Sequence, residues 1–345
     1  MTPIQIQVIN YIKQNPLRSS NDIHKGLGGI IGYSTLKRLL TELISEKLVV
    51  SQGKLKGTRY DISPEYNLLY EVNTQDYFQR EQDERLIKDT FDFSLIKDVL
   101  AKATIFTIKE REKLDLLHLK FLDNIAKLSG TVYDKEMERL AIDLSWKSSQ
   151  IEGNTYSLLE TERLLKEKQT ASGKPKDDAV MLLNHKEALN FIIEHKDYVF
   201  PLSIRGIEDI HTILIRDLDV ERSIRHNKVG ITGTNYVPLD NEYQIREALT
   251  EMCTLINEKE SPLEKSLLTL VLLSYIQPFA DGNKRTARIV ANAILIASGY
   301  CPISFRTVDS IAYKEAMLVF YELNNISAFK KIFIDQFEFA VKTYF

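Results

Sequence analysis

The chain has 345 residues, 44% of them hydrophobic, and a net charge of −3, so it can bury a large core, and its length predicts two or three domains. No apolar run approaches the length of a membrane span and the amino terminus has no charged-then-apolar signal segment, so we expect a cytoplasmic protein without membrane contact. Its two cysteines, Cys253 and Cys301, are too few and too far apart to indicate a disulfide framework or a zinc site.

Residues 1–64 are expected to form a separate domain. Apolar residues recur at helical spacing in residues 4–12, Ser19 can cap a second short helix, and a third helix begins at Ser34. Residues 48–62 contain two strand-like segments around a polar turn. Three helices followed by a β-hairpin resemble a winged helix-turn-helix domain.

The charge of this first domain differs from that of the rest of the chain. Residues 1–63 contain nine Lys or Arg and four Asp or Glu, a net charge of +5, which leaves −8 for the remainder. A basic winged helix suggests DNA contact, although the same fold also serves in docking and dimerisation. The residues predicted to contact DNA lie on the third helix and the hairpin: Ser34, Thr35, Lys37, Arg38, Lys54, Lys56 and Arg59.

The rest of the chain is predicted to be mainly α-helical. Residues 65–130 are expected to form a helical linker, polar at first and amphipathic later, and residues 131–345 a helical core. The last two amphipathic helices, from residue 311 onward, carry many aromatic side chains, which we expect in the core or on the surface of a homodimer.

A carboxylate lies in an unfavourable place at the end of the predicted helix 137–153. Gly153 and Asn154 are signals for a helix C-terminus, so Glu152 faces the negative end of the helix dipole. Such a carboxylate requires a cationic partner, and an arginine is the obvious candidate. Ser148, one turn earlier, points the same way.

The sequence QPFADGNKRTAR, which ends at Arg288, has the composition of an anion-binding loop between two buried helices. Gly282 and Asn283 tolerate positive φ, so consecutive backbone N–H groups can converge, and the next helix directs its positive end to the same place. Arg285 and Arg288 share one face of that helix and can reach further phosphate oxygens. A di- or triphosphate fits this pattern, with Asp281 placed to hold Mg²⁺.

Two motifs in this order resemble those of Fic-domain proteins. The sequence SSQIEG, at residues 148–153, is similar to the family's inhibitory motif, Ser/Thr-x-x-x-Glu-Gly/Asn. Residues 277–288 are similar to its signature, His-Pro-Phe-x-Asp-Gly-Asn-x-Arg-x-x-Arg. The resemblance covers roughly residues 133–337. It implies a helical Fic fold that uses ATP and transfers AMP to a Ser, Thr or Tyr hydroxyl of a target protein, which can be the chain itself.

The resemblance also implies roles for individual residues. Phe279 would anchor the loop in the core and Asp281 would bind Mg²⁺. The residues implied in nucleotide binding are Gly282, Asn283, Lys284, Arg285 and Arg288. The inhibitory motif comprises Ser148, Glu152 and Gly153, and its glutamate would pair with Arg288 and block the γ-phosphate contact. Residues 229–238 alternate apolar and polar side chains, which predicts a β-hairpin. In the family such a flap covers the nucleotide and pairs with an extended target segment, here through Val229, Gly230, Ile231, Thr232 and Gly233.

Gln277 departs from the family's signature. The family's histidine acts as general base, whereas a glutamine amide can only orient a hydroxyl by hydrogen bonding. A general base typically contributes ~10²–10⁴ in rate, so we expect AMP transfer to be strongly weakened while nucleotide binding persists. Three explanations stay open: a pseudoenzyme that senses nucleotide, an enzyme with a substitute base such as His226 or Glu152, and a deliberately altered variant.

Three functions are therefore compatible with the sequence. The first is an ATP-binding Fic protein of the protein adenylyltransferase family, inhibited by Glu152 and impaired by Gln277. The second is a catalytically inactive, nucleotide-sensing regulator that binds DNA. The third is a partner-docking protein in which neither DNA nor catalysis is essential.

Overall fold

The computed structural model describes residues 2–345, apart from the side chain of Lys56. The chain divides into two compact units, of which the first ends at Glu71 and the second begins at Val72. This boundary lies further along the chain than residue 64, the limit expected from the sequence. The reason is that the short helix α4 (Pro64–Leu69) packs Tyr66 against the core of the first unit.

The first unit contains the three helices and the hairpin expected from its sequence. The helices are α1 (Pro3–Gln14), α2 (Ser20–Gly26) and α3 (Tyr33–Ser45), and the side chains of Thr2 and Ser19 cap the first two. Strands β1 (Val49–Gln52) and β2 (Arg59–Ile62) pair antiparallel on either side of the 3₁₀ turn η1 (Leu55–Gly57). The apolar faces of α1 and α3 form the core together with residues of both strands.

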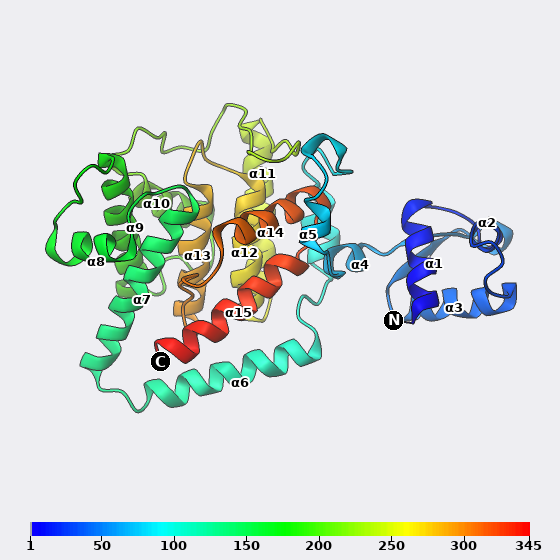
Figure 1. Cartoon of the computed structure of the whole chain (residues 1–345), viewed down its shortest axis with the longest axis horizontal. Helices are drawn as coiled ribbons and strands as arrows, with labels where there is room; N and C mark the ends of the chain where they lie inside the picture. Colours follow the sequence, from blue (N-terminus) through cyan, green and yellow to red (C-terminus); the bar gives the residue numbers. More distant parts are fainter. Residues whose placement is uncertain (1) are drawn as a thin grey trace. The chain divides into compact units, whose positions relative to one another are not determined.

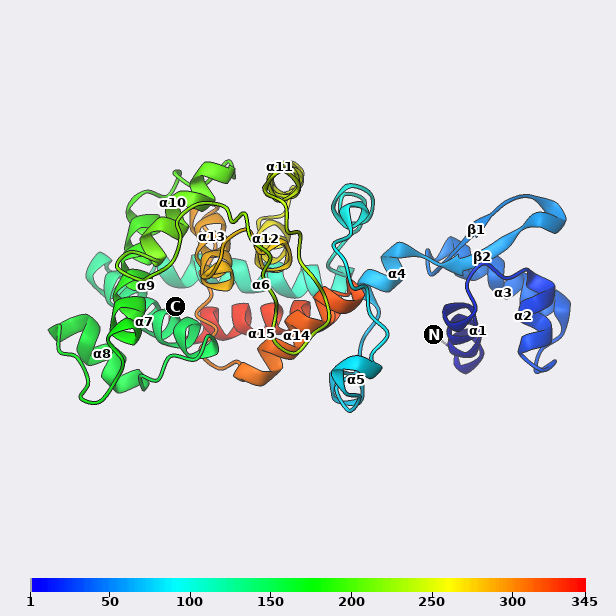
Figure 2. The same ribbon diagram turned by 90° about the horizontal axis from the view of Figure 1, so that it is seen from above.

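The second unit is built from helices (Figures 1 and 2). It begins with three short elements, α5 (Thr74–Tyr77), η2 (Gln82–Glu84) and the π-helix η3 (Leu95–Leu100). The longer helices follow in the order α6 (Ile108–Ile125), α7 (Gly130–Ile151), α8 (Leu158–Glu167), α9 (Lys176–Glu194), α10 (Ile204–Leu214), α11 (Glu242–Glu258), α12 (Pro262–Ile276), α13 (Asn283–Ala297), α14 (Ser310–Leu323) and α15 (Ser327–Thr343). Among the described residues, no helix combines the length and apolar character that crossing a membrane requires.

Helices α12 and α13 lie side by side at the centre of this unit (Figures 1 and 2). Every residue of α12 from Leu263 to Ile276 is buried, because the sequence of this helix is apolar on nearly all faces. Helices α11 and α14 pack against α12, while α9 and α10 pack against α13. This packing fixes the two helix ends that the loop at residues 277–282 connects.

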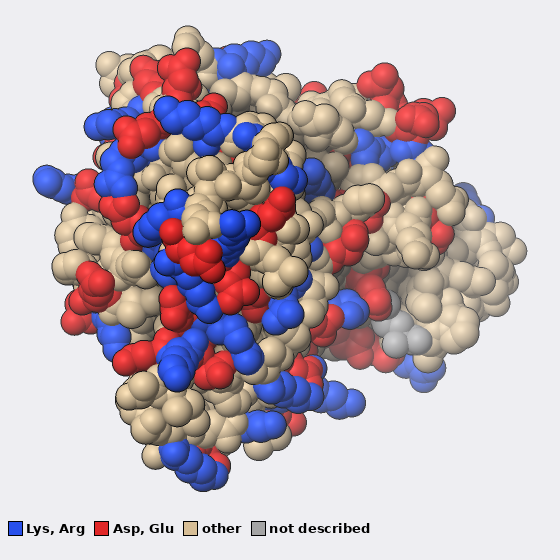
Figure 3. All heavy atoms as spheres, turned by 60° about the vertical axis from the view of Figure 1, so that its left-hand side comes forward, with Lys and Arg blue, Asp and Glu red and all other residues tan. Residues whose placement is uncertain are grey.

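The surface over α7 to α10 carries charges of both signs. Figure 3 shows Lys and Arg side chains interspersed with Asp and Glu on this face. Ion pairs such as Lys166 with Glu162 and Arg216 with Glu187 contribute to the pattern. Exposed pairs of this kind add little stability. The face shown has no extended region of a single sign, the feature that favours nucleic-acid binding.

The predicted β-hairpin at residues 229–238 is wrong. In the described part of the chain the strands are β1 and β2 alone, and residues 229–238 form an extended loop that turns at Gly233, where φ is 88°. Buried and exposed side chains do alternate here, and the buried Tyr236 stacks on Tyr275 of α12 with ring centroids 4.8 Å apart. Packing against a helix, rather than strand pairing, explains the period of two.

Candidate functional site

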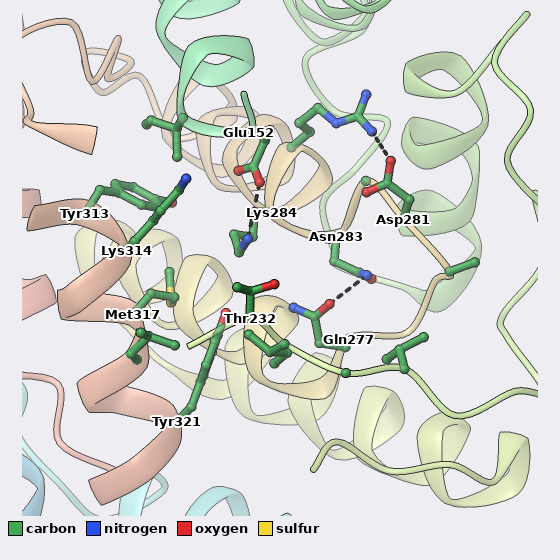
Figure 4. A pocket seen from close by; sticks show the side chains of 18 residues that line it. Glu152, Thr232, Gln277, Asp281, Asn283, Lys284, Tyr313, Lys314, Met317 and Tyr321 are labelled. Carbon is green, nitrogen blue, oxygen red and sulfur yellow. Dashed lines mark hydrogen bonds and ion pairs between the residues drawn. The ribbon is translucent and has the colours of Figure 1, made fainter. Parts of the chain in front are cut away.

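A pocket of about 390 Å³ lies where four elements of the second unit meet (Figure 4). They are the end of α7, the loop between α12 and α13 with the first turn of α13, one face of α14, and residues 229–239, here called the flap segment. The predicted site residues that line it are Glu152, Val229, Gly230, Ile231, Thr232, Gln277, Asp281, Gly282, Asn283, Lys284 and Arg285. The remaining ones, Ser148, Gly153, Gly233, Phe279 and Arg288, are not part of the lining.

The loop between α12 and α13 is held by its own side chains. Gln277 ends α12 in a left-handed conformation, with φ 52°. The Asn283 side chain accepts from the Phe279 backbone N–H at 2.8 Å and donates to the Phe279 carbonyl oxygen at 2.8 Å. Phe279 is fully buried and stacks on the imidazole of His211, with ring centroids 3.6 Å apart. The shape of the loop is therefore supported by contacts within the chain.

The first turn of α13 offers hydrogen-bond donors to the pocket. Gly282 is the N-cap residue, with φ 82°, and no side chain caps the helix, so its first backbone N–H groups have no partner within it. A β-carbon at Gly282 would come within 3.4 Å of the His211 ring. The position thus needs glycine for both its conformation and its close packing. An uncapped helix N-terminus of this kind favours an anion.

Arg285 and Asp281 form an ion pair beside these N–H groups. The Arg285 Nη2 lies 2.7 Å from the Asp281 Oδ2, and the arginine side chain is 2% exposed whereas the aspartate is 65% exposed. The other guanidinium nitrogen, Nη1, is buried and has no hydrogen-bond partner. The described residues contain no group of three or more His, Cys, Asp or Glu able to hold a metal ion. Asp281 alone could bind Mg²⁺ only together with phosphate oxygens and water.

Glu152 is bound by two cations at the end of α7, and Figure 4 shows one of them, Lys284. Its Oε1 lies 2.7 Å from the Arg288 Nη2, and its Oε2 lies 3.2 Å from the Lys284 Nζ. Arg288 is completely buried and also donates to the Ser148 hydroxyl at 2.8 Å and to the Ser148 carbonyl at 3.0 Å. Gly153, with φ 100°, turns the chain immediately after the glutamate.

The two cations determine the charge state of Glu152. Burial alone would raise the pKa of this carboxyl, but the charges of Arg288 and Lys284 and their hydrogen bonds lower the pKa to about 2. Glu152 is therefore ionised near neutral pH, and it is a very weak base. Arg288 keeps one buried nitrogen, Nη1, without a hydrogen-bond partner.

Both polar atoms of the Gln277 side chain are hydrogen-bonded to the helices that flank the loop. Its Nε2 donates to the Ser274 carbonyl at 2.7 Å, and its Oε1 accepts from the Asn283 Nδ2 at 2.9 Å. This orients the amide at the pocket wall but supplies no proton acceptor. His226, considered above as a substitute base, is not among the lining residues and pairs with Glu242 at 3.0 Å.

Arg225 is a site residue that the sequence does not reveal. It is 1% exposed, and its Nε donates to the Gln277 carbonyl at 2.6 Å. The same guanidinium donates to the carbonyls of Asn227, at 2.7 Å, and Leu239. These two residues lie before and after residues 229–232, the part of the flap segment that lines the pocket. Burial lowers its pKa. A lone arginine in a polar stretch carries no local signal of burial, so only the folded chain identifies it.

Two histidines beside the site were also not distinguished by sequence. His211 bonds through Nε2 to the Asp281 carbonyl at 3.0 Å, and burial lowers its pKa to about 4. His185 is fully buried without a hydrogen-bond partner, and burial followed by the charges of Arg288 and Arg285 lowers its pKa well below the usual range. Both imidazoles are therefore neutral near pH 7 and add no positive charge.

The residues predicted to contact DNA lie in the first unit. Ser34, Thr35, Lys37 and Arg38 are exposed on α3, and Lys54 is exposed between the two strands. Arg59 is exposed at the start of β2. The side chain of Lys56 lies outside what the structure describes.

Comparisons with known proteins converge on one family. Residues 201–295 match the model of the Fic/DOC family. The chain is 29% identical over 177 residues to "Protein adenylyltransferase Fic" of Nematostella vectensis, covering 49% of the chain and 41% of that protein. It is 26% identical over 204 residues to "Protein adenylyltransferase fic-1" of Caenorhabditis elegans, covering 56% and 39%. The chain thus spans about two fifths of the length of these curated relatives.

Solved structures agree on the fold. Fic-1 (residues 134–508) of Caenorhabditis elegans superposes with a TM-score of 0.59 at 24% identity, over 68% of this chain and 72% of that one. A Fic-domain signalling protein from Bacteroides thetaiotaomicron gives 0.58 at 21% identity, over 67% and 95%. The second unit therefore has the helical fold of these Fic proteins, and within it residues 201–295 are similar to the Fic/DOC family.

Proposed function

We propose that this chain binds ATP in the pocket at the start of α13 and belongs functionally to the protein adenylyltransferases. The substrate would be a target protein with a Ser, Thr or Tyr hydroxyl, including the chain itself. The observation that carries this proposal is a buried donor without an acceptor, the Nη1 atom of the pocket-lining Arg285, in the first turn of the uncapped helix α13. Donors in this state are costly unless an anion binds them.

Different residues of the pocket would bind different parts of the nucleotide. The backbone N–H groups at Gly282 and Asn283 would bind phosphate oxygens, with Lys284 and Arg285 adding charge from the same turn. Asp281 would leave Arg285 to share Mg²⁺ with those oxygens, and the metal ion would neutralise phosphate charge. The apolar and aromatic face of α14 gives the remaining part of the pocket a surface suited to a base.

Glu152 would act as an internal inhibitor. Its carboxylate occupies Arg288, and Ser148 accepts two more bonds from the same guanidinium. A γ-phosphate that needs Arg288 must displace the glutamate, so the intramolecular ion pair lowers the apparent affinity. Lys284 strengthens the inhibition, since it binds the second oxygen of the same carboxylate.

Gln277 would limit the chemical step. At this position the reaction needs a group that takes the proton from the attacking hydroxyl, and the amide cannot do so. Its fixed hydrogen bonds to Ser274 and Asn283 still hold the loop in shape. We infer nucleotide binding with slow residual transfer.

Replacing Glu152 with glycine is expected to tighten Mg-ATP binding by ~10-fold, about 1.4 kcal/mol, because Arg288 becomes free for phosphate. Isothermal titration calorimetry on the full chain measures this. Glu260→Gly, which changes an exposed loop glutamate outside the pocket lining, serves as the matched control and should bind like the wild type. Absence of Mg-ATP binding in both the wild type and Glu152→Gly would contradict the proposed function.

Restoring a base is expected to restore transfer. The double variant Gln277→His, Glu152→Gly should label itself with α-labelled ATP ~10²–10⁴ times faster than Glu152→Gly alone, the usual contribution of a general base. Autoradiography of the chain over time provides the measurement. Equal rates for the two variants would show that position 277 does not limit the reaction.

The inhibitory ion pair should contribute to stability in a pH-dependent way. Glu152 has a depressed pKa of about 2, so its stabilising effect is present above the ordinary pKa of 4.5 and is lost as the pH falls toward 2. Glu152→Gln should lower the free energy of unfolding by roughly 3 kcal/mol at pH 7, and this difference should shrink between pH 4.5 and 3. Urea denaturation followed through Trp146, the single tryptophan, tests it. A difference that stays constant over this range would refute the assignment.

DNA binding by the first unit is a second candidate function. The observation that favours it is the exposed row on α3, formed by Ser34, Thr35, Lys37 and Arg38, in a segment of net charge +5. Docking of a partner protein on this same row is the remaining alternative.

The double variant Lys37→Glu, Arg38→Glu is expected to weaken DNA binding ~10-fold or more and to reduce its salt dependence. A mobility-shift assay with the full chain at two salt concentrations shows this. The double variant Lys120→Glu, Lys127→Glu, which changes two exposed lysines of the second unit, is the charge-matched control. If the wild type gives no salt-dependent shift, the DNA hypothesis fails and partner docking is favoured.

A further inference from the structure

A segment that precedes the Fic-domain match runs along the flap segment. We call residues 77–92 the brace. Three alternate residues of the flap segment are bound by it. Arg85 Nη2 donates to the Gly233 carbonyl at 2.6 Å. The Asn235 side chain accepts a hydrogen bond from the Gln82 amide at 2.6 Å and donates one to the Asp83 carboxylate at 2.8 Å. The Val237 N–H donates to the Asp89 carbonyl at 2.8 Å, and Val237 forms an isolated parallel bridge with Thr90.

The brace is itself fixed to α14 and α12. The Tyr77 hydroxyl donates to the Glu322 carboxylate at 2.5 Å, and the Lys88 N–H donates to the Glu322 carbonyl at 2.8 Å. At the other end, Phe91 stacks on Tyr275 with centroids 4.7 Å apart. Tyr275 lies two residues before Gln277, so the brace, the flap segment and the loop share one support.

Arg85 is the centre of this arrangement. Its side chain is 4% exposed and lies 3.3 Å from Glu322, whose side chain is completely buried. Its guanidinium also lies over the ring of Phe78 at 5.0 Å. Burying such an ion pair has a desolvation cost that apolar residues would avoid, so stability alone explains it poorly. Its Nη2 lies between the Glu322 carboxylate and the Gly233 carbonyl, so one nitrogen joins α14 to the flap segment.

Residues 229–232, the inner part of the flap segment, are held in place through the residues on either side of them. Residues 229–232 line the pocket, yet none of them takes part in a backbone hydrogen bond among those found in the described residues. Arg225 holds the chain just before them, and the brace holds it just after them. Their position at the rim of the pocket is therefore set from outside.

We propose that Arg85 is a positioning residue that, through the brace, sets the flap segment for an incoming protein substrate. This inference rests on the proposed function. The brace touches neither the loop of Gly282 nor the cations around Glu152, so losing it should impair acceptance of the protein substrate and leave nucleotide binding intact. The region before the Fic-domain match is thus part of the working site.

Hydrogen–deuterium exchange of the full chain tests the positioning directly. Arg85→Ala is expected to speed exchange of the Tyr236 and Val237 amides, which donate to the Thr234 hydroxyl and the Asp89 carbonyl, by ~10-fold, equivalent to about 1.4 kcal/mol, with α13 unchanged. Arg85→Lys should give an intermediate effect, because it can keep one of the two contacts. Arg80→Ala, an exposed arginine in the same segment, is the control. Unchanged exchange in the flap segment overturns the inference.

A second variant tests the same contacts in case Arg85→Ala does not fold. Asn235→Ala removes both side-chain contacts from an exposed position, so it keeps the fold while loosening the same segment. It should also raise exchange of the Tyr236 and Val237 amides. If neither variant alters exchange there, the brace does not position the flap segment.

A functional measurement separates this inference from the proposed function. In the Gln277→His, Glu152→Gly background, adding Arg85→Ala should lower self-labelling ~10-fold at low protein concentration and less at high concentration, because acceptance of the protein acceptor is weakened. Calorimetry should give a Kd for Mg-ATP within two-fold of the background. If the background itself binds no Mg-ATP, the proposed function fails. If it binds and labels, but Arg85→Ala labels equally at every concentration, the brace inference fails.

Discussion

The ion pair between Arg288 and Glu152 is the contact on which the rest of the site depends. Arg288 is fully buried at the centre of the helical unit, where an uncompensated charge is very costly. The end of α7 compensates it with one carboxylate and two Ser148 oxygens. This contact fixes α7 on α13 and, with Lys284, keeps Glu152 ionised. In the proposed function the phosphate of a bound nucleotide would compete with Glu152 for Arg288, because one guanidinium cannot bind both anions fully.

The loop beside this ion pair keeps its shape by internal hydrogen bonding. Asn283 bonds both backbone groups of Phe279, and the Gln277 amide bonds Ser274 at the end of α12 and Asn283 at the start of α13. The neutral imidazole of His211 stacks on Phe279 and hydrogen-bonds to the Asp281 carbonyl. Geometry and proton transfer are therefore separable at position 277: the amide satisfies the loop's hydrogen bonds, whereas it offers no basic atom.

Two buried arginines hold the flap segment at the pocket. Arg225 bonds the carbonyl of Asn227, just before the segment, and the carbonyl of Gln277 in the neighbouring loop, whereas Arg85 bonds the Gly233 carbonyl within the segment. Guanidinium groups suit this task because several donors in one plane can reach carbonyls from different segments. The segment thus needs no partner strand, which explains how a loop with strand-like alternation remains ordered inside a helical fold. The family match at residues 201–295 includes Arg225, while Arg85 lies outside it.

The sequence by itself determined the features that depend on near neighbours. Helical periodicity identified α12 and α13, glycine and asparagine indicated where α7 ends and where the loop turns, and the order of helices and strands in the first unit followed from local patterns. The tertiary structure decided which distant groups meet. Glu152 and Arg288 are 136 residues apart, and Arg85 and Gly233 are 148 apart. It also showed that the alternation in the flap segment reflects packing on Tyr275 rather than pairing with a strand. The position of Glu152 at a helix end already indicated a cationic partner, and the family resemblance implied Arg288. The contact of Arg85 with Gly233 leaves no local signal, because burial depends on how whole helices pack.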